Sequence, residues 1–301
     1  MNGVSELKSL QRIAVVGFGE AGGILAEDLV RAGFTVTAYD ILFDSPATQE
    51  PMFAKARAVN VRAAPTLREA IVAADLVISA VTATASTQVA KDASASLANR
   101  QLFLDINSVS PSTKRENARL VEASGAQYVE AAVMAPVPGK RLAVPMLLGG
   151  PHAVPVAKAL SAMGMNPTAV AGELGVASAV KMCRSIIIKG LEALAVECVM
   201  AAREFDAAEQ VFASLDRTFP HMGWTADLPD YLVARVAEHG RRRAAEMHEV
   251  ERTLASVGVM PVMSRATAER QQRLVDAMAT KGLRYTDAAF TWRALLEALD
   301  D

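Results

Sequence analysis

Gly17, Phe18, Gly19, Glu20, Ala21 and Gly22 have the spacing Gly-x-Gly-x-x-Gly. The apolar run 13–16 before them predicts a strand, and the stretch 24–31 after them predicts a helix. In that context the first glycine allows a tight turn, the second lets the backbone approach a pyrophosphate, and the third lets helix and strand pack closely. Amide groups at the helix start then face the phosphate. The pattern predicts a dinucleotide site; the alternative is an ordinary glycine-rich turn.

Asp40 follows the next predicted strand, 34–39, and lies about 20 residues beyond the glycines. An acid at this point is typical of a carboxylate that binds the ribose hydroxyls of NAD. Sites for NADP normally place an arginine just past the same strand, whereas this chain continues with Ile41, Leu42, Phe43 and Asp44. Two acids without a neighbouring arginine favour NAD over NADP.

Short apolar runs and helix-like segments alternate through the first half of the chain. Strands are predicted at 76–81, 102–106, 128–133 and 144–148, and helices at 85–98, 111–123 and 153–163. This alternation predicts a parallel, doubly wound sheet. Because ligands bind beyond the carboxyl ends of such strands, we expect Val81, Thr82 and Asn107 to border the cofactor. The alternative is that the polar residues of these segments only cap helices and turns.

The character of the sequence changes near Gly172. Strand signals end at Gly175, and helical periodicity continues over about 176–205, longer than most globular helices. The remainder is rich in helix-forming residues, with expected breaks at Pro220, Pro229, Gly240, Gly258, Pro261 and Gly282. The predicted class is α/β, with a Rossmann domain over 1–174 and an all-helical domain over 175–301, joined by the long helix. Apolar faces on the C-terminal helices favour a homodimer.

The segment from Gly172 to Ser185 reads GELGVASAVKMCRS. Together with the glycine turn, it resembles the β-hydroxyacid dehydrogenase family, which includes 3-hydroxyisobutyrate and 6-phosphogluconate dehydrogenases. The resemblance covers most of the chain, and from Lys181 to Phe205 it is closer to a poorly characterised branch with a distinctive C-terminal helical domain. It implies that Lys181 is the catalytic acid/base and that Asn107 lies where the family holds nicotinamide and substrate.

Lys181 also has a physical case of its own. Hydride transfer between a carbinol carbon and a nicotinamide needs a group that takes the hydroxyl proton, or returns it to the carbonyl. A lysine does this when burial or a neighbouring cation lowers its pKa toward neutrality. Arg184 and Ser185 share its predicted helix face, so Arg184 is expected to favour the neutral base and to pair with an anionic substrate group. Two other interpretations stay open: Lys181 as a surface lysine, and Arg184 in a structural ion pair with Glu173 or Glu192.

The chain departs from the family pattern at two places that would touch the substrate. Arg184 and Ser185 stand where related dehydrogenases usually carry asparagine, and Met134, Ala135 and Pro136 replace a Ser-Gly-Gly loop. A backbone nest with a hydroxyl has become an apolar turn stiffened by proline. We therefore expect a bulkier or more apolar substrate, with Met134 and Ser185 among its contacts and Arg184 as a substitute anchor.

Composition narrows the class of protein. The chain has 301 residues, 51% of them hydrophobic, and a net charge of −2, which argues against nucleic acid as a partner. The basic run Arg241–Arg243 is followed by acids and is interpreted as a solvated helix face. Cys183 and Cys198 suit a reducing compartment, the four histidines lack metal-ligand spacing, and charged residues interrupt the apolar stretch 186–202. With no signal-peptide pattern at the N-terminus, we expect a cytoplasmic protein that is not in a membrane.

These observations predict an NAD-dependent oxidoreductase that acts on a CH–OH group of a small-to-medium, acidic substrate, without a metal. An imine reductase is the nearest enzyme alternative, against which the lysine argues. The alternative from another class is a non-catalytic NAD(H)-binding protein that senses redox state.

Overall fold

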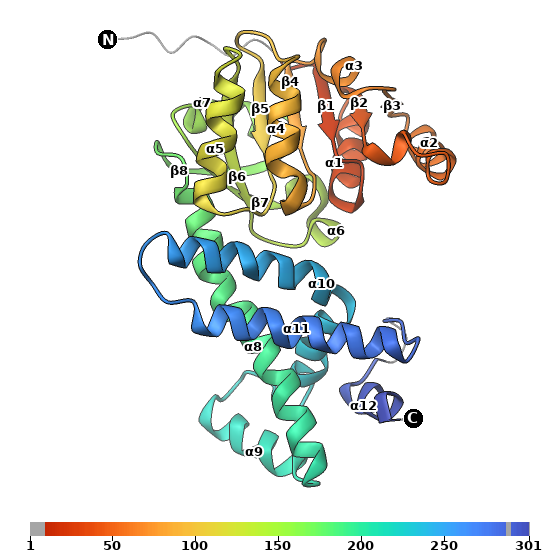
Figure 1. Cartoon of the computed structure of the whole chain (residues 1–301), viewed down its shortest axis with the longest axis vertical. Helices are drawn as coiled ribbons and strands as arrows, with labels where there is room; N and C mark the ends of the chain where they lie inside the picture. The colour runs from red at the N-terminus through yellow and green to blue at the C-terminus, as the bar shows by residue number, and fades with distance from the viewer. Residues whose placement is uncertain (1–9, 287–289, 301) are drawn as a thin grey trace. The chain divides into compact units, whose positions relative to one another are not determined.

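Apolar runs in the first half of the chain form one eight-stranded sheet in the order β3-β2-β1-β4-β5-β6-β7-β8 (Figure 1). The computed structural model describes residues 10–286 and 290–300. Its strands are β1 Arg12–Val16, β2 Thr35–Tyr39, β3 Arg62–Ala63, β4 Leu76–Ser79, β5 Leu102–Asp105, β6 Gln127–Val133, β7 Pro145–Gly149 and β8 Asn166–Ala171. The strand order reverses between β1 and β4, which is the switch point of a doubly wound sheet.

Helices cover both faces of this sheet. They are α1 Glu20–Arg31, α2 Gln49–Ala58, α3 Leu67–Ile71, α4 Ser86–Ser94, α5 Pro111–Glu122, α6 Val137–Lys140 and α7 Ala153–Ala162. Successive residues of β1 point to opposite faces, so that Ile13 and Val15 enter one hydrophobic cluster while Ala14 and Val16 enter another. Burial on both faces explains why the strands read as continuous apolar runs rather than as alternating ones.

The predicted fold class, a Rossmann-type sheet followed by helices, is confirmed, but the sheet is not parallel throughout. β7 pairs with β6 antiparallel, whereas every other neighbouring pair is parallel. The connection 134–144 contains only short helical turns, and an antiparallel neighbour does not need the long crossover that a parallel one does. The edge strands β3 and β8 were not predicted, because neither contains a run of buried apolar residues.

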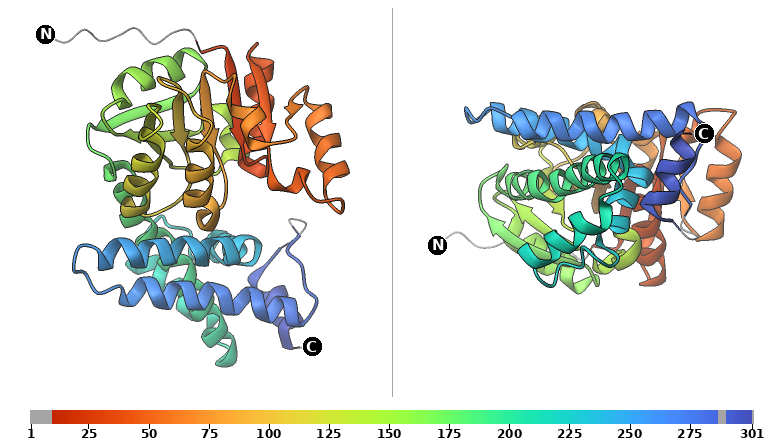
Figure 2. Two further views of the ribbon diagram at one scale, coloured as in Figure 1. Left: turned by 45° about the horizontal axis from the view of Figure 1, so that its top comes forward. Right: turned by 90° about the horizontal axis from the view of Figure 1, so that it is seen from below.

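The helical part begins with α8 Val176–Glu204, in the stretch where the sequence predicts a helix over 176–205. The chain divides into two compact units, Met1–Lys181 and Met182–Asp301, so the division falls inside α8. The second unit continues with α9 Ala208–Thr218, α10 Leu228–Ala255, α11 Val262–Thr280 and α12 Trp292–Asp300. Figure 2 shows α10 and α11 packed as an antiparallel pair.

One of the expected helix breaks is wrong. Pro229 lies in the first turn of α10, so the chain does break just before it, but α10 continues through Gly240. A Cβ on Gly240 would lie 2.6 Å from Val275 and 3.0 Å from the carbonyl oxygen of Gln271, both on α11. Gly240 therefore lets α10 and α11 approach closely and does not end a helix.

The interpretation of Arg241–Arg243 as a solvated face is wrong for Arg243. Its guanidinium is buried and pairs with Glu192 of α8. The partner of Glu192 is therefore Arg243 and not Arg184. Beside this pair, Lys189 Nζ lies 2.5 Å from Glu246 Oε2. A buried polar layer thus joins α8 to α10. Within the residues described, no helix is both long and apolar enough to span a membrane.

Candidate active site

The turn between β1 and α1 has the geometry that its glycines predict. Gly17 has φ +92°, and a Cβ there would lie 2.4 Å from the carbonyl oxygen of Ala80 at the end of β4. A Cβ on Gly22 would lie 1.9 Å from the carbonyl oxygen of Gly17. A Cβ on Gly19, in contrast, would meet no atom within 4 Å. Two of the glycines are needed for packing, and the third faces open space at the start of α1, where the sequence predicts the pyrophosphate.

Asp40 and the glycine turn are held together directly. The amide of Phe18 donates to Asp40 Oδ2 at 2.6 Å, and the amide of Leu42 donates to Asp40 Oδ1 at 2.9 Å. Asp40 is therefore fixed at the end of β2 beside the turn. Lys55 of α2, which the sequence reasoning missed, reaches the same turn and donates to the carbonyl oxygens of Phe18 and Gly19, each at 2.7 Å.

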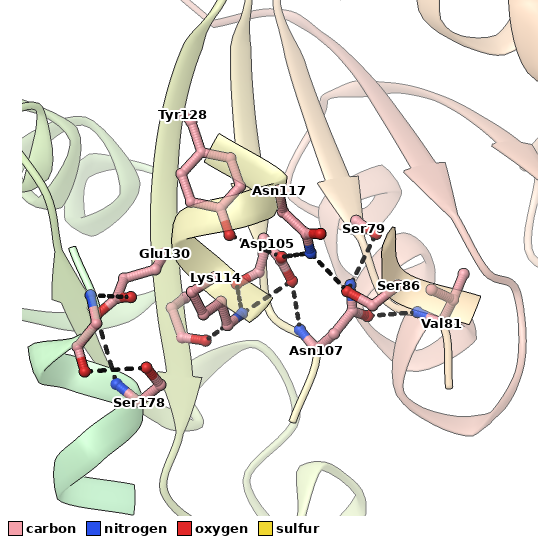
Figure 3. A network of polar contacts seen from close by, with 12 residues as sticks. Ser79, Val81, Ser86, Asp105, Asn107, Lys114, Asn117, Tyr128, Glu130 and Ser178 are labelled. Atoms are coloured by element: carbon pink, nitrogen blue, oxygen red, sulfur yellow. Dashed lines mark hydrogen bonds and ion pairs between the residues drawn. The ribbon is translucent and has the colours of Figure 1, made fainter. Parts of the chain in front are cut away.

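The turns after β4 and β5 meet through Asn107. Its Oδ1 accepts from the amide of Val81 at 2.7 Å, and its Nδ2 donates to Ser79 Oγ at 2.9 Å and Ser86 Oγ at 3.3 Å (Figure 3). Asn107 is buried, while Thr82 is exposed and contacts Thr84 through their hydroxyls at 3.1 Å. The Asn107 side chain thus positions the two turns that border the predicted cofactor site.

Asp105 lies next to Asn107 in a buried polar network (Figure 3). Its carboxylate accepts from Lys114 Nζ at 2.8 Å, the Asn107 amide at 2.9 Å, Asn117 Nδ2 at 3.0 Å and the Tyr128 hydroxyl at 2.8 Å. Burial favours the neutral acid, but Lys114 and these hydrogen bonds outweigh it and hold the pKa of Asp105 below its usual value. Burial and the Asp105 charge raise the pKa of Tyr128. Asp105 is therefore held as a carboxylate within the sheet.

A second buried carboxylate, Glu130 of β6, holds the start of α8. Glu130 Oε2 accepts from the amide of Gly175 at 2.6 Å, and Oε1 accepts from the amides of Ala177 at 2.8 Å and Ser178 at 3.4 Å (Figure 3). These bonds provide partners for amides at the start of the helix that would otherwise lack them. The carboxylate also interacts favourably with the positive end of the helix dipole. Lys181 follows three residues after Ser178 on α8, with its side chain half-buried.

The remaining predicted substrate residues are not all in the first unit. Met134 lies there, half-buried just beyond β6, and its amide donates to the carbonyl oxygen of Pro145 at 2.9 Å. Arg184 and Ser185 lie on α8 within the second unit, Arg184 exposed and Ser185 buried. The structure therefore brings together the glycine turn with Asp40, and Val81 with Asn107. It also fixes the helix that carries Lys181.

Two of the residues that the sequence reasoning missed share one signal. Lys114 and Glu130 are charged residues inside segments predicted as regular elements, whereas no element was predicted around Lys55. Lys114 and Asn117 lie three residues apart on α5, a spacing that places them on one helix face. Glu130 interrupts an otherwise apolar strand. A buried charge is rare unless it is paired. Lys114 and Glu130 therefore each indicate that a partner exists, but the sequence does not show which residue it is.

Comparison with known proteins places the chain in a family. Residues 12–172 match the family described as the NAD binding domain of 6-phosphogluconate dehydrogenase, and residues 202–274 match a domain of unknown function, DUF1932. The first match covers more than half of the chain. The chain belongs to the β-hydroxyacid dehydrogenase family. The predicted resemblance is confirmed, including the C-terminal helical domain that sets this branch apart.

Solved structures and curated relatives agree with this β-hydroxyacid dehydrogenase assignment. A conserved hypothetical protein from Sinorhizobium meliloti 1021 is 36% identical, with 99% of each chain covered and a TM-score of 0.75. Another solved protein, described as similar to 3-hydroxyacid dehydrogenases, is 31% identical over 89% of this chain and 98% of its own, with a TM-score of 0.69. A probable 3-hydroxyisobutyrate dehydrogenase from Mycobacterium tuberculosis is 28% identical over 69% of this chain and 67% of its own length. The first domain is an NAD-binding domain.

Proposed function

We propose that the chain is an NAD-dependent dehydrogenase or reductase that interconverts a hydroxyl and a carbonyl on a small-to-medium, acidic substrate. The observation that carries the proposal is that one unit contains both the glycine turn at the switch point and the anchored start of α8, with Lys181 just beyond it. Bound nicotinamide would accept or supply the hydride.

The protein groups around the turn would bind and orient the cofactor. The open face at Gly19 and the first amides of α1 would hold the pyrophosphate, and Asp40 would accept hydrogen bonds from the adenosine ribose. Asp40 and the absence of an arginine in the stretch 41–54 favour NAD over NADP, because an added phosphate would face the Asp40 carboxylate. Val81, Thr82 and Asn107 would border the nicotinamide half.

Lys181 would move the proton. In oxidation its neutral amine takes the hydroxyl proton as the carbinol carbon loses its hydride, and in reduction its ammonium returns that proton to the carbonyl oxygen. Arg184, exposed one turn further along α8, would pair with a substrate carboxylate or phosphate, with Ser185 nearby. The Met134, Ala135 and Pro136 turn supplies apolar contact in place of hydrogen-bond donors, which favours a substrate with an apolar portion.

A panel of hydroxyacids and aromatic alcohols, followed by absorbance of the reduced nicotinamide, tests this proposal. Lys181→Met should lower kcat about a thousandfold and leave the Kd for NADH unchanged, because the lysine acts on substrate and not on cofactor. Arg184→Ala should raise the KM for the substrate. A wild-type chain that binds NADH but turns over no member of the panel would instead support a redox sensor.

We further propose that two copies of the chain associate through the second unit. Ile187 and Leu194, seven residues apart on α8, are 71% and 56% exposed. Large apolar side chains aligned on one helix face suit a symmetric contact. Light scattering should give twice the chain mass for the wild type and the single mass for the double variant Ile187→Glu, Leu194→Glu. The matched change Val154→Glu, at a side chain 62% exposed in the first unit, should leave the mass unchanged.

A further inference from the structure

Lys55 lies outside the Gly-x-Gly-x-x-Gly motif in the sequence, and its side chain contacts backbone carbonyl groups of the motif. The residue is on α2, which flanks the β2 and β3 edge of the sheet (Figures 1 and 2). Its Nζ lies 2.7 Å from the carbonyl oxygen of Phe18 and 2.7 Å from that of Gly19, and 4.8 Å from the centre of the Phe18 ring. A Cβ on Gly23 would lie 2.8 Å from the same nitrogen, so the bare glycine leaves room for the ammonium.

These two bonds determine where the amides of the turn point. In a trans peptide the carbonyl of one residue and the amide of the next face opposite ways. An ammonium on the carbonyls of Phe18 and Gly19 therefore turns the amides of Gly19 and Glu20 away from Lys55. Gly19 is the N-cap of α1 and supplies no side-chain hydrogen bond to the helix. The two amides thus belong to the helix end at which a phosphate binds.

Phe18 is held through both of its backbone polar groups. Its carbonyl oxygen accepts from Lys55, while its amide donates to Asp40 Oδ2 at 2.6 Å. Asp40 and Glu20 are the acids whose charges act on Lys55. The turn is therefore fixed before any cofactor arrives, and less conformational freedom is lost on binding.

We propose that Lys55 is a positioning residue for the dinucleotide pyrophosphate, acting through the Phe18 and Gly19 carbonyls and adding one positive charge behind the turn. The proposal rests on the NAD site described above. It differs from a role at the ribose, which Lys55 would have if it acted only by pairing with Asp40.

Three ligands separate these roles. NADH and ADP-ribose contain the pyrophosphate, whereas AMP contains the adenosine ribose and a single phosphate. Dissociation constants would be measured by the fluorescence of NADH and by competition for the other two. The variants are Lys55→Met, which removes the charge at nearly constant length, Lys55→Arg, which restores a donor, and the control Lys158→Met at an exposed lysine of α7.

Lys55→Met should raise the Kd for NADH and for ADP-ribose about fivefold, the effect of losing charge-assisted hydrogen bonds at an accessible site. The Kd for AMP should change by less than about twofold, Lys55→Arg should recover most of the loss, and Lys158→Met should match the wild type. Equal Kd values for Lys55→Met and the wild type would overturn the role, and so would an equal loss for AMP. A wild-type chain that binds none of the three ligands would instead overturn the cofactor assignment.

Discussion

The N-termini of α1 and α8 each follow a glycine with positive φ, Gly17 at +92° and Gly175 at +99°. At α8 the buried carboxylate of Glu130 accepts from the first amides of the helix. At α1 the N-cap is Gly19, which contributes no side-chain hydrogen bond. The Lys55 ammonium donates instead to the backbone carbonyl oxygens of Phe18 and Gly19. One helix end therefore receives an anion from the protein, and we propose that the other receives one from a ligand.

The difference shows how one local motif serves two purposes. The positive end of a helix favours an anion, whether it belongs to a side chain or a cofactor. An internal carboxylate makes the start of α8 a fixed support for Lys181. We propose that the open end of α1, with amides oriented by Lys55, is the binding site for the cofactor pyrophosphate. The following changes test this comparison, beginning with the largest expected effect.

Asp105→Asn should weaken both regions at once. Asp105 fixes Asn107, which bonds Val81 near α1, and it pairs with Lys114, which reaches the carbonyl oxygen of Ala131 beside Glu130. Removing one charge from a buried pair should lower the free energy of unfolding by about 4 kcal/mol at pH 7, measured by urea denaturation. Asp92→Asn, at an exposed acid of α4, is the control.

The stabilities of the wild type and of Asp105→Asn can also be compared as a function of pH. Because the pKa of Asp105 is lowered in the folded state, its stabilisation is present above the unfolded value of about 4 and is lost as pH falls through the folded value. The difference between wild type and Asp105→Asn should therefore shrink below about pH 4. A difference that stays constant with pH would mean that the ionised pair does not stabilise the fold.

Gly19→Ala should affect only the open helix end. A Cβ there meets no protein atom within 4 Å and φ is −69°, so the variant should unfold at the wild-type temperature. The methyl group would occupy space that the pyrophosphate needs, and the Kd for NADH should rise on the order of a hundredfold. Wild-type affinity in this variant would place the phosphate elsewhere.

Glu130→Gln should affect only the filled helix end. Both carboxylate oxygens accept from amides, so the glutamine NH2 would face an N–H group inside the protein. The free energy of unfolding should fall by about 2 kcal/mol, and kcat should fall while the Kd for NADH stays constant. Glu116→Gln, at an exposed position of α5, should behave as wild type. Unchanged stability of Glu130→Gln would contradict the capping role.

Gly175→Ala compares the two glycines before α8. At φ +99° an alanine should cost about 1.5 kcal/mol of stability, seen as a lower urea midpoint. Gly172 has no positive φ, and a Cβ there would meet no atom within 4 Å, so Gly172→Ala should be neutral. Equal urea midpoints for the two variants would show that the positive φ of Gly175 does not contribute to the stability at the start of α8.

Local features of the site were predictable from the sequence. The turn from Gly17 to Gly22, the strand and helix around it and the acid at Asp40 depend on neighbouring residues, whose conformational limits are local. The glycine turn and Asp40 led to the NAD-binding assignment, and the family resemblance led to the expected role of Lys181. The helix break expected at Gly240 is wrong, because this glycine serves the close approach of α11 to α10, which the local sequence does not show.

The sequence by itself determined the fold class, the cofactor turn and the helix that carries Lys181. Only the tertiary structure decided that Glu130 caps α8, that Lys55 holds the turn from α2, and that Asp105 pairs with Lys114. It also paired Arg243 with Glu192 and made the basic run part of a buried layer. The physical reason is that periodicity records which residues are buried, whereas the partner of a buried charge depends on which elements pack together in space.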